Sequence, residues 1–174
     1  MKNALAILTL IICACSIPTS ESERDGLQIS VRLTTGERSR DSSSQTTTIT
    51  VERDEIVWTS GTSDGFRTRP APERKEFKLS PADKERLVKL IRSNNLLVTD
   101  RIYLPQDAPG FYFSVSVDLT LGKKQVGINI SAPRNAVKVK EEKLYQNTLT
   151  LVTELYRIMN RQDKSVPVCA TFFC

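Results

Sequence analysis

Several short stretches of the chain alternate apolar and polar residues, and this period of two predicts β-strands with one buried face. The first stretch is 27–33, in which Arg32 is one of the polar residues. No apolar residue occurs at 36–45, which predicts a solvent-exposed loop, and the strand pattern resumes over 46–60. Segment 61–73 contains two prolines, which cannot donate ladder hydrogen bonds, and predicts a second loop before a short strand at about 74–79.

Two segments predict hairpins with a definite register. A turn at Arg53-Asp54 or a four-residue loop over 52–55 gives the same pairing, in which Val51 faces Ile56 and Ile49 faces Trp58. This pairing places Trp58 in the core or sheet rather than in a ligand site.

The second hairpin covers 111–131, with Gly122-Lys123 as a turn suited to type II′. Counting back from this turn pairs Leu119 with Val126, Val117 with Ile128 and Val115 with Ile130. All six apolar side chains then share one face. The opposite face of the first of these two strands carries Tyr112, Ser114, Ser116, Asp118 and Thr120.

Two other segments have the helical period. Ser80, Pro81 and Asp83 form an N-cap pattern, and the helix that follows is expected to end at Asn94 or Asn95. Its apolar stripe is Leu87, Leu90 and Ile91, and its expected solvent face is Lys84, Glu85, Arg86 and Lys89. The segment 140–160 predicts a second helix, with Leu144, Leu151, Val152, Leu155, Ile158 and Met159 on one broad face.

The element order is therefore four strands, a helix, two strands and a helix. We expect an α+β fold in which an antiparallel sheet of five to six strands is covered on one face by two helices. The length suits one domain, which we place at 26–165, followed by a tail at 166–174.

The apolar run at 4–14 is long enough for an export signal and too short to cross a membrane as a helix. It ends at Ile12-Cys13-Ala14-Cys15, which resembles the signal of bacterial lipoproteins. The resemblance implies that 1–14 is removed, that Cys15 carries the lipid, and that 15–25 is a tether to the membrane. Ser16 resembles the pattern that directs such proteins to the outer membrane of many diderm bacteria. The alternative is ordinary secretion of a soluble protein.

Lipidation of Cys15 leaves two cysteines, Cys169 and Cys174, in the mature chain. We expect them to form a disulfide that staples the tail, and a redox or metal-binding pair is the alternative. The short loop limits the stabilisation from such a bond to roughly 2 kcal/mol.

The sequence contains no histidine, which excludes catalytic triads, Cys-His pairs and histidine zinc sites. Its 25 basic and 20 acidic residues are spread along the chain, unlike the clustered charge of a nucleic-acid-binding protein. No phosphate loop or calcium loop is present, and we expect no cofactor and no metal.

Three pairs of acidic residues are the candidates for acid–base chemistry: Glu141 with Glu142, Asp54 with Glu55, and Asp83 with Glu85. They lie near helix starts or a turn, where carboxylates are favoured for structural reasons, so we assign no catalytic residue. The candidate binding loop contains Phe66, Arg67 and Arg69, and its alternative is an ordinary solvated connection with Glu73 and Glu76 balancing the charge of Arg74 and Lys75.

The element order also resembles that of small bacterial envelope proteins and of emfourin-type inhibitors of thermolysin-like metallopeptidases. This likeness rests on Leu79-Ser80-Pro81, on the approach from Asp107 to Phe111, and on the hairpin that ends at Ile130. The resemblance implies a noncatalytic binding module, anchored in the membrane by its lipid, whose partner is an unknown envelope protein. Protease inhibition is one alternative, and a hydrolase that uses only carboxylates or serine is another. The sequence does not indicate an oligomeric state.

Overall fold

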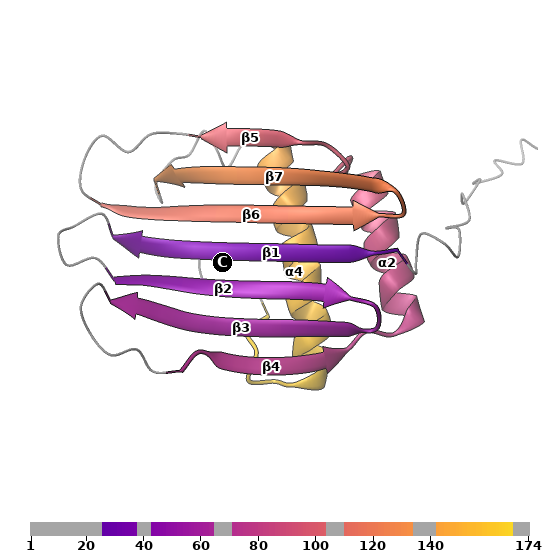
Figure 1. Cartoon of the computed structure of the whole chain (residues 1–174), viewed down its shortest axis with the longest axis horizontal. Helices are drawn as coiled ribbons and strands as arrows, with labels where there is room; N and C mark the ends of the chain where they lie inside the picture. The colour runs from indigo at the N-terminus through magenta and orange to yellow at the C-terminus, as the bar shows by residue number, and fades with distance from the viewer. Residues whose placement is uncertain (1–25, 38–42, 65–70, 104–109, 134–141, 169–174) are drawn as a thin grey trace, which may run out of the picture.

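Seven strands form one sheet, and two helices pack against it in the described part of the chain (Figure 1). This computed structural model describes residues 26–37, 43–64, 71–103, 110–133 and 142–168. The strands are β1 (Gln28–Glu37), β2 (Ser43–Glu52), β3 (Glu55–Asp64), β4 (Glu73–Lys78), β5 (Asp100–Tyr103), β6 (Phe111–Leu121) and β7 (Lys124–Pro133). The helices are α2 (Pro81–Ser93) and α4 (Lys143–Gln162). The fold is therefore α+β, as predicted.

The strand order across the sheet is β4-β3-β2-β1-β6-β7-β5, so the first strand of the chain lies at the centre. Neighbouring strands are antiparallel except β5, which runs parallel to β7. We expected an antiparallel sheet of five to six strands, whereas the structure has a mixed sheet of seven. We did not predict β5, because its four residues, Asp-Arg-Ile-Tyr, are too few to show an alternation and its pairing with β7 is made only in the folded chain.

Both predicted hairpin registers are confirmed. In the first, Val51 pairs with Ile56 and Ile49 with Trp58, around a two-residue turn in which Arg53 has a φ of 54°. In the second, Val115, Val117 and Leu119 pair with Ile130, Ile128 and Val126, as predicted. Gly122 has a φ of 60° at the first turn position, as a type II′ turn requires.

The expected loop at 36–45 is shorter than predicted. Strand β1 continues to Glu37 and β2 begins at Ser43, with Gly36 paired to Ser44. At this end of the strands the side chains are polar or absent, so the alternation that marks a strand is missing although the ladder continues. The hydroxyls of Thr34 and Thr46 lie 3.4 Å apart across the same pair of strands.

The N-cap of α2 is formed as predicted. The Ser80 hydroxyl accepts a hydrogen bond from the Asp83 backbone N–H at 3.2 Å and donates to the Asp83 carboxylate at 2.7 Å, and Pro81 begins the helix. The helix ends at its C-cap Asn94, followed by Asn95 in the left-handed region with a φ of 52°. The second helix, α4, begins three residues after the expected start and ends two residues after the expected end.

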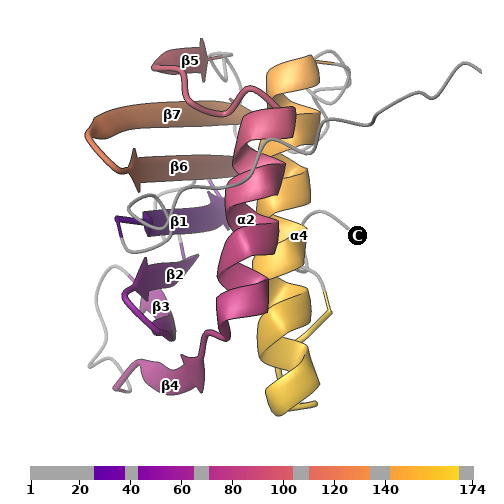
Figure 2. The same ribbon diagram turned by 90° about the vertical axis from the view of Figure 1, so that its right-hand side faces the viewer.

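Both helices lie on the same side of the sheet (Figure 2). The core is the single layer of apolar side chains between them and the sheet, and it includes Trp58, which is 8% exposed as predicted. Each fully buried leucine or isoleucine contributes about 1.5–3 kcal/mol relative to exposure. Fully buried members include Ile29, Leu33, Ile49, Ile56, Leu87, Ile91, Leu119, Ile128, Ile130 and Leu151.

One part of the expected solvent face of α2 is wrong. Lys84 is 7% exposed, because its stem lies within the protein while its ammonium contacts the Asp54 carboxylate at 2.5 Å. Arg86 is exposed but also has a structural partner, since its Nε lies 3.0 Å from the buried carboxylate of Glu154 on α4. These two ion pairs tie α2 to the first hairpin turn and to α4.

Candidate functional site

The residues that the sequence singled out as functional lie outside the described part of the structure. These are Cys15, Phe66, Arg67, Arg69, Cys169 and Cys174, together with Glu141 of the acidic pairs. The lipid site, the disulfide and the basic binding loop therefore stay predictions. In the described residues that follow this loop, Arg74 pairs with Glu76 at 2.7 Å and Lys75 lies 3.2 Å from Glu73, which is the predicted charge balance.

A side chain from the end of α4 occupies the free edge of β4 at Lys78. The Lys78 backbone N–H donates to the Gln162 side-chain oxygen at 3.0 Å, and the Gln162 amide donates to the Lys78 carbonyl at 2.8 Å. Lys75 donates to the Asp163 carboxylate at 3.0 Å. Hydrogen bonds from the Ser165 hydroxyl and backbone N–H, and then from Lys75, lower the pKa of Asp163 to about 2. The glutamine therefore takes the place of a neighbouring strand at Lys78.

The opposite edge strand, β5, is also blunted. The backbone N–H of Arg101 donates to the carboxylate of Asp100 at 2.7 Å, so it is not free to pair with a strand from another molecule. The strand is only four residues long, which further limits any pairing along this edge.

The acidic residues at one end of the molecule surround an open hollow of about 490 Å³ lined by Asp54, Glu55, Lys78, Leu79, Ser80, Asp83 and Gln162. Two of its three carboxylates are already paired, Asp54 with Lys84 and Asp83 with Arg161 at 2.6 Å. Burial acts to raise the pKa of Asp83, but hydrogen bonds from Arg161 and Ser80 outweigh it and hold this pKa below its usual value. A general acid needs a raised pKa, so this hollow has the charge arrangement of a structural site.

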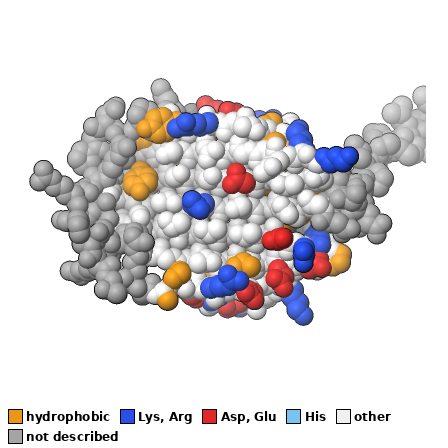
Figure 3. Space-filling model, in the orientation of Figure 1, with side chains coloured by type: hydrophobic (Ala, Val, Ile, Leu, Met, Phe, Trp, Pro, Cys, Tyr) orange, Lys and Arg blue, Asp and Glu red, His pale blue; other side chains and the backbone are white. Residues whose placement is uncertain are grey.

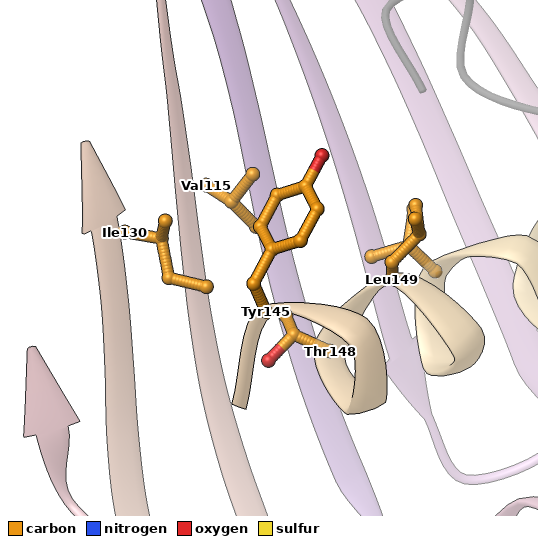
Figure 4. A pocket seen from close by; sticks show the side chains of 6 residues that line it. Val115, Ile130, Tyr145, Thr148 and Leu149 are labelled. Atoms are coloured by element: carbon orange, nitrogen blue, oxygen red, sulfur yellow. The ribbon is translucent and has the colours of Figure 1, made fainter. Parts of the chain in front are cut away.

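A second gap lies between α4 and the sheet, where Tyr145, Thr148 and Leu149 face Val115 and Ile130 (Figure 4). It leaves no space for a water molecule. The Thr148 hydroxyl donates to the Leu144 carbonyl at 2.8 Å, and burial raises the pKa of the Tyr145 hydroxyl. This gap is part of the packed core and does not hold a ligand. Among the described residues, no three ligand-type side chains are grouped to hold a metal ion.

The face of the sheet opposite the helices is the remaining large surface, and we call it the open face. No described element covers it (Figure 2). The strand registers place one row of residues across all seven strands, with Arg32 at its centre. In order from β4 to β5, this row is Arg74, Thr59, Thr48, Arg32, Ser116, Asn129 and Arg101. Figure 3 shows this face as mostly backbone and side chains that are neither charged nor hydrophobic, with isolated charges in its middle.

Three arginines are evenly spaced along this central row. Each outer arginine lies three strands from Arg32, or about 14 Å between Cα atoms at about 4.8 Å per strand. Arg74 is paired with Glu76, whereas Arg32 is exposed and has no acidic partner within 4.0 Å among the described residues. Arg101 lies over the ring of Tyr103, 5.2 Å from its centroid.

Charge divides the open face into two parts. Its acidic residues are Asp118, Glu76, Glu52 and Glu55, and all lie on the side of the central row toward the hairpin turns. The other side, together with the central row, has no described acidic residue at an open-face position. The rows on that side contain Thr34, Thr46, Ser114, Ser131, Tyr103, Gly36, Ser44, Tyr112 and Pro133. An anionic partner is therefore favoured on this basic part.

Sequence reasoning placed Arg32 and Tyr112 on the polar sides of their own strands but did not bring them together. Their proximity depends on the pairing of β1 with β6, in which Arg32 faces Ser116 and Gly36 faces Tyr112. Arg101 and Tyr103 were missed because β5 was missed. The sequence did contain one signal for the open face: in every long strand, small polar residues alternate with the apolar ones.

No helix among the described residues is long and apolar enough to cross a membrane. No protein-family model matches the chain, and no curated protein matches it in sequence.

Proposed function

We propose that this protein is a noncatalytic binding module, held at the cell envelope by a lipid on Cys15, and that its partner binds the open face. The observation that carries the proposal is the seven-stranded face with no described element over it. The helices occupy the other face, and side chains close both edge strands at the positions described above. An antiparallel sheet can leave one face to solvent, so the proposal also depends on the arrangement of charges on this face.

The charge arrangement supports binding over hydrolysis. The carboxylates Asp54 and Asp83 in the acidic hollow are held by Lys84 and Arg161. By contrast, Arg32 at the centre of the open face is exposed and has no described acidic partner within 4.0 Å. An unpaired arginine surrounded by hydroxyl groups is suited to receive a partner's carboxylate or phosphate.

The test compares two charge reversals in the full-length protein. Arg32→Glu changes the centre of the open face, and Lys89→Glu makes the same change on the exposed side of α2. Both variants are expressed in the native host, and retention of envelope components is measured after crosslinking and purification. We expect Arg32→Glu to lose the crosslinked partner and Lys89→Glu to keep it. Equal retention by both variants would remove the open face as the binding surface.

The anchor is tested separately by intact mass. Protein extracted from membranes should have the mass of residues 15–174 plus acyl chains, and a disulfide between Cys169 and Cys174 lowers that mass by two hydrogens. Cys15→Ser should shift the protein to the soluble fraction. An unmodified wild-type chain in the soluble fraction would contradict the lipid anchor.

A further inference from the structure

One corner of the open face contains two tyrosines beside its basic part. Tyr112 lies over Gly36 of the neighbouring strand: a Cβ atom added at Gly36 would lie 3.0 Å from both the ring Cε1 and the hydroxyl oxygen of Tyr112. The missing side chain therefore makes room for the ring against the sheet. Tyr112 is half-buried in this position, so part of its ring still faces solvent.

The second tyrosine is at the edge of the same corner. Tyr103 is 50% exposed, and the guanidinium of Arg101 lies 5.2 Å from its ring centroid. This cation–π contact fixes one face of the ring and places a positive charge beside it. The corner thus presents an exposed aromatic ring with an attached cation.

The strand registers give the separation of the two tyrosines. Tyr103 pairs with Ser131 on β7, and Tyr112 pairs with Pro133 on the same strand. They are two strands and two residues apart, which corresponds to about 12 Å between Cα atoms. This span is longer than a single sugar ring, so two stacked rings would belong to an extended chain.

Polar groups of the kind that bind sugar hydroxyls lie next to the tyrosines. The Ser116 hydroxyl donates to the Asn129 side-chain oxygen at 2.8 Å, which fixes the amide and leaves its N–H groups available to donate outward. Ser114 and Ser131 form the next row toward the tyrosines and are partly exposed. Flat aromatic surface with fixed, short polar side chains matches a ligand that has both apolar ring faces and hydroxyl edges.

The charges of this corner favour an acidic ligand over a neutral one. Arg32 and Arg101 lie at the two ends of the part of the central row that contains Ser116 and Asn129. Asp118, two residues from Ser116, lies beyond this row toward the hairpin turns, and no described open-face position from the row toward the tyrosines is acidic. Arginine binds carboxylates in a bidentate geometry. We infer that the corner formed by Tyr103, Tyr112, Arg101, Arg32 and Asn129 binds a linear acidic polysaccharide, with sugar rings on the tyrosines and sugar carboxylates on the arginines. This inference rests on the proposed function and names its ligand.

Binding is tested by calorimetry on the full-length protein in detergent with three probes: oligogalacturonate, which is linear and carboxylated, a neutral cello-oligosaccharide, and polyphosphate. We expect oligogalacturonate to bind more tightly than the neutral oligosaccharide. Tyr112→Ala and Tyr103→Ala should each weaken it by roughly 3- to 10-fold, and Tyr112→Phe should retain it. Lys89→Glu is the matched surface control.

Gly36→Ala removes no ligand-contacting group, and its added Cβ would lie 3.0 Å from the Tyr112 ring and 3.1 Å from the Ser44 Cβ, so the ring must move away from the sheet and the neighbouring strand must adjust slightly. The affinity of Gly36→Ala for oligogalacturonate should fall at a temperature where its thermal unfolding curve shows that it is still fully folded. Polyphosphate binding that equals oligogalacturonate binding and ignores both tyrosines would overturn the inference in favour of a general anion surface. Absence of oligogalacturonate binding would also overturn it.

A wrong ligand and a wrong binding surface give different results. If Arg32→Glu abolishes capture of the envelope partner but oligogalacturonate does not bind, the sugar assignment is wrong and the open face stands. If Arg32→Glu has no effect on capture, the open face itself is wrong.

Discussion

The hydrogen bonds between Gln162 and Lys78 give a prediction that can be worked out from the structure. Gln162→Ala removes two hydrogen bonds to the Lys78 backbone: the bond from the Gln162 amide to the Lys78 carbonyl at 2.8 Å, and the bond from the Lys78 N–H to the Gln162 side-chain oxygen at 3.0 Å. Each such bond contributes about 0.5–1.5 kcal/mol net, and because Gln162 is exposed we expect a total loss of about 1–2 kcal/mol.

Urea denaturation at pH 7 measures this loss directly. With a slope of about 2 kcal/mol per molar urea, the midpoint should fall by about 0.5–1 M. Hydrogen exchange of the Lys78 amide should speed up, because the substitution leaves this N–H without its acceptor. Gln125→Ala, at an exposed position of β7, is the matched control and should change the midpoint little.

Gln162→Glu separates the donor from the acceptor. The carboxylate still accepts from the Lys78 N–H, but it cannot donate to the Lys78 carbonyl and it adds a negative charge at the C-terminal end of α4. Protonation would restore the donor and remove the charge, and we expect these two effects to outweigh the retained N–H bond, which favours the carboxylate. The folded-state pKa of this new carboxyl should then lie above its unfolded value of about 4.3. The loss of unfolding free energy of Gln162→Glu relative to wild type should then be smallest below about pH 4.3 and grow as the pH rises. A midpoint loss for Gln162→Ala no greater than that of Gln125→Ala, or a deficit for Gln162→Glu that ignores pH, would refute this reasoning.

Three further predictions concern charge and packing. The pKa of Asp163 is about 2 in the folded protein, so the ionised carboxylate stabilises the fold above its unfolded-state pKa, and this stabilisation is lost as the pH falls toward 2. The difference in melting temperature between wild type and Asp163→Asn should therefore shrink from pH 5 to pH 2. A constant difference would contradict this prediction. Arg86→Ala leaves the buried Glu154 carboxylate with only a 3.6 Å contact to an arginine of its own helix and should cost about 1–3 kcal/mol in urea unfolding, more than Glu154→Leu does. Leu155→Ala should cost about 2–5 kcal/mol, against less than about 0.5 kcal/mol for Val98→Ala, which is 39% exposed; similar losses would count against the assigned core.

Local patterns were sufficient to predict the hairpins and the start of α2. In each hairpin the turn and the apolar alternation lie within one short segment, so the register of Ile49 with Trp58 and of Val117 with Ile128 followed from counting. The N-cap at Ser80 depends on residues within one helical turn. These features need no information from distant parts of the chain.

Features that depend on distant contacts were not predictable in the same way. The central place of β1 results from its pairing with β6, in which Ile29 faces Leu119 from 90 positions away in the chain. The parallel pairing of β5 with β7 and the burial of Lys84 against Asp54 likewise require the folded chain. The sequence shows a charged residue at position 84, but only the packing of α2 shows that its stem is covered.

The candidate site likewise has a part that single strands predict and a part that only the folded sheet shows. Alternation within single strands already assigned Arg32 and Tyr112 to polar faces, because each lies between apolar neighbours. Their combination into one corner with Arg101 and Tyr103 needs the strand order, and the place of the Tyr112 ring needs Gly36 opposite it. The basic loop at Phe66, Arg67 and Arg69 lies outside the described residues and stays a prediction.

The side chains at the two edge strands have a consequence for molecules held close together. Proteins attached to a membrane diffuse in two dimensions, where neighbouring copies meet often and in similar orientations. An open β-sheet under such conditions is prone to grow by adding strands from adjacent molecules. Gln162 bonded to Lys78 at one edge, and Asp100 bonded to the Arg101 N–H at the other, each occupy backbone groups that an added strand would need. If the proposed lipid anchor holds many copies on one surface, these bonds oppose the addition of strands from neighbouring copies at both edges.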